Sequence, residues 1–284
     1  MQISRRERGV LAGARALWSQ VHPVFMLPPL AASLTGGAFS GGIGPRVAFL
    51  HVAALFFAVY TAHVKDGYVD FYVRDEDKTH PLTAGGCQAA LFAAAGGFLV
   101  AIAGLWVLAG AGAVLLTTPT WFLGYFHAPQ LDTNTVGATA GYPAGIALAF
   151  LGGFYIQAGI LSVPVLGIAV VFFLFLSGIK IVDDTKDYDY DRSIDKQTVA
   201  VRLGPDAAYR AAYALMATGM VAVLGMAAGL EGVPPSAAGA PVVFALVAVA
   251  TRRAGPELAT KLLIRGSYLF LAVLVCAVWF RPLV

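Results

Sequence analysis

Residues 165–191 are VLGIAVVFFLFLSGIKIVDDTKDYDYD, an apolar run that ends directly in a group of acidic side chains. Between Val165 and Val182 the single charged residue is Lys180. The hydrocarbon core of a membrane is about 30 Å thick and requires about 20 apolar residues per helix. This stretch therefore predicts a transmembrane helix whose end places several carboxylates at the membrane surface.

The rest of the chain has the same character. Of its 284 residues, 58% are hydrophobic and 12% are charged, which is too apolar for an ordinary soluble domain. We expect an all-α polytopic membrane protein, one integral domain over residues 1–284, with nine transmembrane helices. The predicted spans are 17–40, 45–66, 87–109, 111–127, 141–160, 162–182, 207–229, 236–250 and 262–280.

The basic residues give an independent test of this count, because cytoplasmic loops retain Lys and Arg. With nine spans and a cytoplasmic N-terminus, only Arg46 and Arg281 fall outside. The segments predicted to face the cytoplasm contain Arg5, Arg6, Arg8, Arg15, Lys65, Arg74, Lys78, Lys180, Lys186, Arg192, Lys196, Arg202, Arg210, Arg252, Arg253, Lys261 and Arg265. The formal charge of +3 thus reflects orientation in a cell membrane, and no nucleic-acid partner is expected.

Residues 1–16 are predicted to be an amphipathic cytoplasmic lead-in, without the apolar core and cleavage site of a signal peptide. Cys87 and Cys276 lie in or beside predicted spans and have no CxxC spacing. We expect both to be inert core residues.

The acidic residues are strongly clustered. Of sixteen, five lie between Asp66 and Asp77 and six between Asp183 and Asp195. Both segments follow predicted spans at the cytoplasmic side, and each contains a KDxxxD sequence. The two clusters are therefore expected to face the same side of the membrane and to meet.

The spacing within the clusters suggests metal binding. Positions i, i+4 and i+8 share a helix face, so Asp183, Asp187 and Asp191 would lie together, as would Asp66 and Asp70. Like charges at this spacing repel, and a cation between them would relieve the repulsion. Hard carboxylate oxygens favour Mg²⁺, which proteins usually bind together with substrate phosphates. The candidate catalytic residues and metal ligands are Asp66, Asp70, Asp183, Asp187 and Asp191.

Cations and tyrosines near the clusters are candidate substrate contacts. Positive groups would neutralise a departing diphosphate, and its loss from an allylic carbon leaves a carbocation that needs a dry aromatic cavity. The candidates are Lys65, Tyr68, Arg74, Lys78, Lys186, Tyr188, Arg192, Lys196 and Arg202. For any one cluster taken alone, the simpler interpretation is a solvated helix end.

The clusters make the chain resemble the UbiA superfamily of intramembrane prenyltransferases. That family carries NxxxDxxxD after the second helix and DxxxDxxxD after the sixth. The second motif is intact at Asp183, Asp187 and Asp191, and the following KQTVAVRLG resembles the family's KxTLAVRxG. In the first motif Asp66 replaces Asn and Arg74 replaces the third acid, with Asp75 and Asp77 as possible substitutes.

The resemblance implies a nine-helix bundle around a central cavity, with cytoplasmic cap loops. It also implies a Mg²⁺-dependent enzyme that transfers the prenyl group of a polyprenyl diphosphate to an aromatic or lipid acceptor. Residues 154–159 and 183–204 most resemble the branch that prenylates dihydroxynaphthoate in menaquinone biosynthesis, although residues 133–145 lack the acid expected there. Two alternatives remain: a terpene cyclase of the same fold that uses no acceptor, and a membrane transporter or cation-binding protein.

Overall fold

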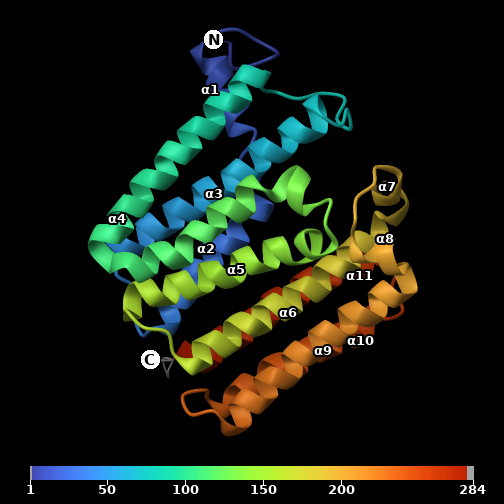
Figure 1. The fold of residues 1–284 in the computed structure, drawn as a ribbon. Coiled ribbons are helices and arrows are strands. Elements are labelled where there is room, and N and C mark those ends of the chain that lie inside the picture. Colours follow the sequence, from blue (N-terminus) through green and yellow to red (C-terminus); the bar gives the residue numbers. More distant parts are fainter. Residues whose placement is uncertain (1, 280–284) are drawn as a thin grey trace.

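The structure, a computed structural model, describes residues 2–279 and is all-helical over that range, apart from one isolated β-bridge between Ser4 and Leu82 (Figure 1). A π-helical turn, η1, covers His127–Leu131, and a 3₁₀ turn, η2, covers Pro235–Ala238. The α-helices are α1 Val10–Trp18, α2 Pro23–Phe39, α3 Pro45–Tyr72, α4 Ala84–Tyr125, α5 Thr135–Ala158, α6 Val163–Lys186, α7 Tyr188–Ser193, α8 Val199–Leu203, α9 Pro205–Gly229, α10 Gly239–Thr251 and α11 Pro256–Trp279.

Six helices in the described part of the chain are long and apolar enough to cross a membrane: α3, α4, α5, α6, α9 and α11. Two shorter apolar segments, α2 and Pro235–Thr251, accompany them. The continuous first span expected over 17–40 was wrong. α1 ends at Trp18 and α2 begins at Pro23, because a proline at the first helical position starts a helix and cannot continue one.

The expected spans 87–109 and 111–127 both fall within α4, whose 42 residues are two helices that meet at a kink. The kink is at Gly110, which has φ 78° and ψ −174° and is not helical. Glycine adopts a positive φ without steric cost, so the direction of the chain changes at this residue. The predicted boundary therefore coincides with a break inside α4.

Two of the predicted spans continue further than expected, and both carry acidic residues. α3 runs on to Tyr72 and α6 to Lys186. Asp66 and Asp70 therefore lie on the last turns of α3, and Asp183 on the last turn of α6. The span expected at 262–280 begins earlier, at Pro256, and its last residue lies outside the described range, as does Arg281.

Paired glycines bring α2 and α5 into close contact. A Cβ on Gly36 would collide with the backbone oxygen of Phe150, and one on Gly153 would collide with that of Ser33. Small residues allow this backbone approach in membrane helices. The main core lies around α5, α6, α9 and α11, where Phe175 stacks on Phe270 with ring centroids 4.8 Å apart.

The N-terminal residues form an arm that holds the loop after α3. The backbone N–H of Arg5 donates to Pro81 O at 2.9 Å, and that of Thr83 donates to Ile3 O at 2.9 Å. The Arg5 guanidinium lies 4.3 Å from the centroid of the Phe71 ring. The arm therefore anchors the chain on both sides of the loop 73–82.

The two cysteines differ in environment. Cys87 is buried beside His80, with its Sγ 3.4 Å from His80 Nε2. Cys276 is exposed on α11, so the prediction that it is a core residue was wrong.

Candidate active site

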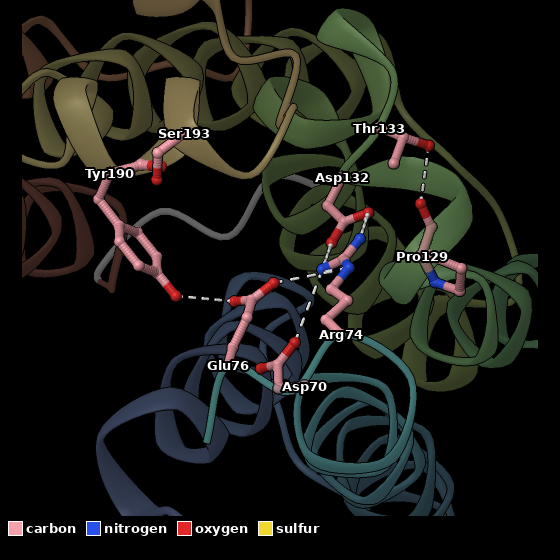
Figure 2. Close-up of polar contacts among 8 residues, drawn as sticks. All are labelled: Asp70, Arg74, Glu76, Pro129, Asp132, Thr133, Tyr190 and Ser193. Carbon is pink, nitrogen blue, oxygen red and sulfur yellow. Dashed lines mark hydrogen bonds and ion pairs between the residues drawn. The ribbon is translucent and has the colours of Figure 1, made fainter. Parts of the chain in front are cut away.

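The two acidic segments meet at one end of the bundle. The hydroxyl of Tyr190, on α7, donates a 2.9 Å hydrogen bond to Glu76 Oε2, in the loop after α3 (Figure 2). The η1 turn joins the same region, since the backbone N–H of Gln197 approaches Asp132 O at 3.4 Å. The expectation that the clusters face the same side and meet is consistent with these contacts.

Arg74 lies at the centre of the first segment. Its guanidinium donates two hydrogen bonds to Asp132, of 2.7 and 3.0 Å, and is 3.6 Å from Asp70 Oδ1 and 3.7 Å from Glu76 Oε1 (Figure 2). These carboxylates, the hydrogen bonds to Asp132 foremost, raise the pKa of Arg74. Three acids thus surround one cation, and the group carries an excess of negative charge.

Local backbone geometry selects which acid joins Arg74. α3 ends at Tyr72, Asp75 takes φ 56°, and the N–H of Glu76 donates back to Asp70 O at 2.8 Å. This turn brings Glu76 toward the guanidinium and leaves Asp75 and Asp77 exposed. The acid beside Arg74 is therefore Glu76, whereas the sequence suggested Asp75 or Asp77 as substitutes.

The second segment is not one continuous helix. Asp187 has φ −101° and ψ 13°, so the helix is interrupted there and α7 begins at Tyr188. The shared face expected for Asp183, Asp187 and Asp191 was therefore wrong in detail. Asp191 is buried, whereas Asp183 and Asp187 are partly or fully exposed and pair with Lys186.

Asp184 is the second buried acid of this segment. Its side chain is 5% exposed and forms an ion pair with Lys180, one turn earlier on α6. The pairing is local, but Asp184 Oδ2 has no hydrogen-bond partner among the described residues. One carboxylate oxygen is thus buried and free at the end of α6.

Two groups of α7 have altered pKa values. Burial raises the pKa of Asp191 to about 6, with Lys196 and Lys180 opposing the shift. The hydrogen bond to Glu76 raises the pKa of Tyr190 to about 12. Tyr190 is consequently a hydrogen-bond donor at neutral pH.

The remaining candidate residues fall into two sets. Five have defined partners. Lys65 lies 4.5 Å from the Tyr125 ring centroid, and Lys196 lies 5.9 Å from that of Tyr190. Arg192 and Tyr188 approach each other, with the guanidinium 3.4 Å from Tyr188 Oη, and Tyr68 packs on Tyr72. Asp66 is half-buried and forms no ion pair with a described residue. Lys78 and Arg202 are exposed, and their side chains form no hydrogen bond or ion pair within residues 2–279.

The carboxylates of this site are suited to Mg²⁺, although they form no complete set of ligands by themselves. Within residues 2–279 no three His, Cys, Asp or Glu side chains are grouped closely enough to hold one ion. Asp70 Oδ1, Glu76 Oε1 and Asp184 Oδ2 are buried without hydrogen-bond partners. Mg²⁺ retains waters and takes few protein carboxylates together with substrate phosphates, so these oxygens fit its requirements.

Sequence reasoning did not select Glu76, Asp132 or Asp184 as candidate site residues. Asp132 immediately precedes residues 133–145, the segment in which an acid was expected and not found. Only the contact with Arg74 identifies it, because the two residues are 58 positions apart. A lone acid after an apolar run carries no distinguishing spacing.

A family model described as the UbiA prenyltransferase family matches residues 25–274. The chain belongs to this family. With its apolar helices, it is therefore an integral membrane prenyltransferase of the UbiA family. No curated protein sequence matches the chain.

Solved structures share the UbiA fold. A digeranylgeranylglyceryl phosphate synthase superposes with a TM-score of 0.75 at 15% identity, over 94% of this chain and 99% of its own. A UbiA homologue from Aeropyrum pernix K1 gives 0.68 at 17%, over 91% and 98%. A homologue from Archaeoglobus fulgidus bound to GPP and Mg²⁺ gives 0.65 at 16%, over 94% and 99%.

Proposed function

We propose that this UbiA-family enzyme is Mg²⁺-dependent, that it ionises a polyprenyl diphosphate between its two acidic segments, and that it transfers the prenyl group to an acceptor. The observation that carries the proposal is the contact between Tyr190 and Glu76, which joins the segments at one mouth of the bundle. A diphosphate placed there would face carboxylates from α3 on one side and from α6 and α7 on the other.

The proposed Mg²⁺ ligands are Asp66 and Asp70 on the first side and Asp183, Asp187 and Asp191 on the second. Glu76 and Asp184 each add a buried carboxylate oxygen that has no hydrogen-bond partner among the described residues. When bound, Mg²⁺ would stabilise the charge that develops on the departing diphosphate. Solved Archaeoglobus fulgidus homologues of the same fold are bound to GPP or DMAPP together with Mg²⁺, which supports a Mg²⁺-dependent reaction of a prenyl diphosphate.

The cations of the site have distinct roles in this proposal. Lys186 and Lys196 are near enough to the acids to contact phosphate oxygens directly. Arg74 is already held by Asp132 through two hydrogen bonds, so we assign it to ordering the first segment. The other candidate substrate contacts are proposed because they lie in or near the acidic segments: Lys65, Tyr68, Lys78, Tyr188, Arg192 and Arg202.

We further propose nine membrane crossings with a cytoplasmic N-terminus. The six long spans become nine if α4 crosses twice around Gly110 and if α2 and Pro235–Thr251 each cross once. The acids then lie at the cytoplasmic surface, together with most of the basic residues. This position at helix ends disfavours a transporter, whose ion ligands are expected near the mid-plane of the membrane.

For the acceptor we propose an aromatic quinone precursor of the dihydroxynaphthoate type, on the basis of residues 154–159 and 183–204. A glycerol-phosphate lipid is the second acceptor to examine. A terpene cyclase reaction would need the same ionisation and no acceptor, so the acidic segments support both reactions equally. Product analysis must separate them.

The decisive experiment measures diphosphate release by the purified protein with Mg²⁺, prenyl donors of several lengths, and aromatic or lipid acceptors, followed by mass spectrometry of the products. Prenylated dihydroxynaphthoate is the expected product. A cyclised hydrocarbon formed from geranylgeranyl diphosphate alone would establish the cyclase instead. If Asp70→Ala and Asp187→Ala both release diphosphate at the wild-type rate, the proposed site is wrong.

A further inference from the structure

A concave surface lies between α9 and α10, and none of the residues that line it belongs to the acidic segments 66–77 and 183–195. It is a groove of about 590 Å³, lined by apolar side chains that include Met216, Met220, Ala245 and Val249. Volumes of this size are typical of ligand sites. The residues that line the groove take no part in the contacts described for the acidic segments.

The two helices are joined at one end of the groove. Thr251 Oγ1 donates to Ala248 O at 2.7 Å, so the hydroxyl of Tyr213 is the donor in its 2.8 Å hydrogen bond to Thr251 Oγ1. This bond ties the last turn of α10 to the first half of α9. Beyond it the small side chains of Ala217 and Ala245 leave the space open.

Two arginines lie at the joined end. Arg210 is on the second turn of α9, and Arg252 immediately follows α10. Both line the groove, both are exposed, and neither forms an ion pair with any carboxylate of residues 2–279. α9 begins directly after α8, and α8 follows the second acidic segment. The end of the groove that carries the two arginines is therefore at the same end of the bundle as the acidic segments (Figure 1).

We propose that this groove binds an anionic phospholipid, with its phosphate between Arg210 and Arg252 and one acyl chain along Met216, Met220 and Val249. Guanidinium groups bind phosphate oxygens through paired hydrogen bonds. Basic pockets between membrane helices on the cytoplasmic side are suited to anionic head groups. The two arginines therefore match the phosphate of the lipid, and the apolar lining matches its acyl chain.

The groove is poorly suited to a prenyl diphosphate. A Mg²⁺-bound diphosphate requires carboxylates, and no Asp or Glu is among the described residues that line the groove. A phosphodiester carries one negative charge and needs only the arginines. The inference depends on the chain being a membrane protein and not on the proposed reaction.

The test uses the full-length protein, delipidated in a maltoside detergent, with native mass spectrometry to compare binding of phosphatidylglycerol and phosphatidylcholine. We expect one phosphatidylglycerol to bind preferentially and the double variant Arg210→Gln/Arg252→Gln to weaken its binding about tenfold. The charge-matched control Arg253→Gln/Arg265→Gln alters two exposed arginines outside the groove and should retain wild-type binding.

A second pair of variants tests the apolar half of the site. Ala245→Phe fills the groove and should weaken phosphatidylglycerol binding, whereas Ala250→Phe on the exposed face of α10 should not. Diphosphate release in lipid-free detergent should be unchanged in all four variants, which separates this site from the active site. Three outcomes would overturn the proposal. The charge-matched control could lose as much phosphatidylglycerol binding as the double variant, or the double variant could bind phosphatidylglycerol like the wild type. The double variant could also lose binding of geranylgeranyl diphosphate in place of phosphatidylglycerol.

Discussion

The hydroxyl of Tyr190 donates a 2.9 Å hydrogen bond to Glu76, joining two segments that lie 114 residues apart in the chain. The contact fixes α7 against the loop after α3, and with it the separation of the two groups of carboxylates. A diphosphate between them must fit that separation. The bond therefore sets a dimension of the site as well as its position.

Tyr190→Phe tests this role. Losing one hydrogen bond to a charged group costs about 1.5 kcal/mol or somewhat more, so we expect the KM for prenyl diphosphate to rise about tenfold with little change in kcat. Initial rates over a range of donor concentrations measure both constants. A large fall in kcat at constant KM would mean that Tyr190 acts on the reacting atoms.

Asp70→Asn and Asp191→Asn each remove the charge of a carboxylate with restricted solvent access while keeping its shape. If these residues hold Mg²⁺, each variant should lose at least about a hundredfold in the rate of diphosphate release. Asp189→Asn is the matched control, because Asp189 is exposed on α7 and lies in the second motif between Asp187 and Asp191. Equal rates for all three variants would remove the metal assignment.

The pKa of Asp191 predicts how Mg²⁺ affinity depends on pH. Burial raises this pKa to about 6, so below that pH the carboxyl of the metal-free protein is protonated and Mg²⁺ must displace the proton. The apparent affinity for Mg²⁺ should therefore increase from about pH 5 to about pH 7 and level off above. Mg²⁺ titrations of diphosphate release at several pH values measure it, and Asp191→Asn should lose this dependence.

Arg74→Ala leaves Asp70, Glu76 and Asp132 without their shared cation. Removing one partner of a largely buried pair costs about 3 kcal/mol, and this should appear as reduced thermal stability in detergent. The double variant Arg74→Ala/Asp132→Asn should recover part of the loss. As a control, Lys261→Ala breaks an exposed pair with Glu257 and should leave the melting temperature unchanged. Full stability of Arg74→Ala would show that the carboxylates need no cation.

Close packing of α2 on α5 predicts a strong effect at Gly153. Gly153→Leu drives a side chain into the backbone of Ser33, which should destabilise the fold by at least about 2 kcal/mol. Gly225→Leu is the control, since a Cβ at Gly225 meets nothing within 4 Å. Thermal unfolding of both variants in the same detergent decides the comparison.

The sequence was sufficient to predict the membrane class, the family and most helix positions. A long apolar run has few stable structures other than a membrane-spanning helix. Prediction from the sequence failed at two helix boundaries. The first span was taken as continuous through His22-Pro23, and the acidic run 183–191 was taken as one helix although Asp187 interrupts it. The first error passed over a proline that is visible in the sequence, whereas no glycine or proline in residues 183–191 marks the break at Asp187.

The composition of the site was predicted less completely than its location. Repeated spacing made Asp66, Asp70 and the acids of the second motif candidate ligands, and this assignment stays a prediction. Glu76 and Asp132 have no such spacing, and their membership follows from side chains that converge on Arg74 from different elements. Sequence periodicity describes one helix at a time, so contacts between loops lie beyond it.

The arm formed by residues 2–5 has a practical consequence for handling the protein. Because Ile3 and Arg5 are hydrogen-bonded to Thr83 and Pro81, a bulky affinity tag or fluorescent fusion placed just ahead of them would strain the backbone that carries Glu76. Purification handles for kinetic work are better placed at the other terminus, or ahead of a long flexible spacer.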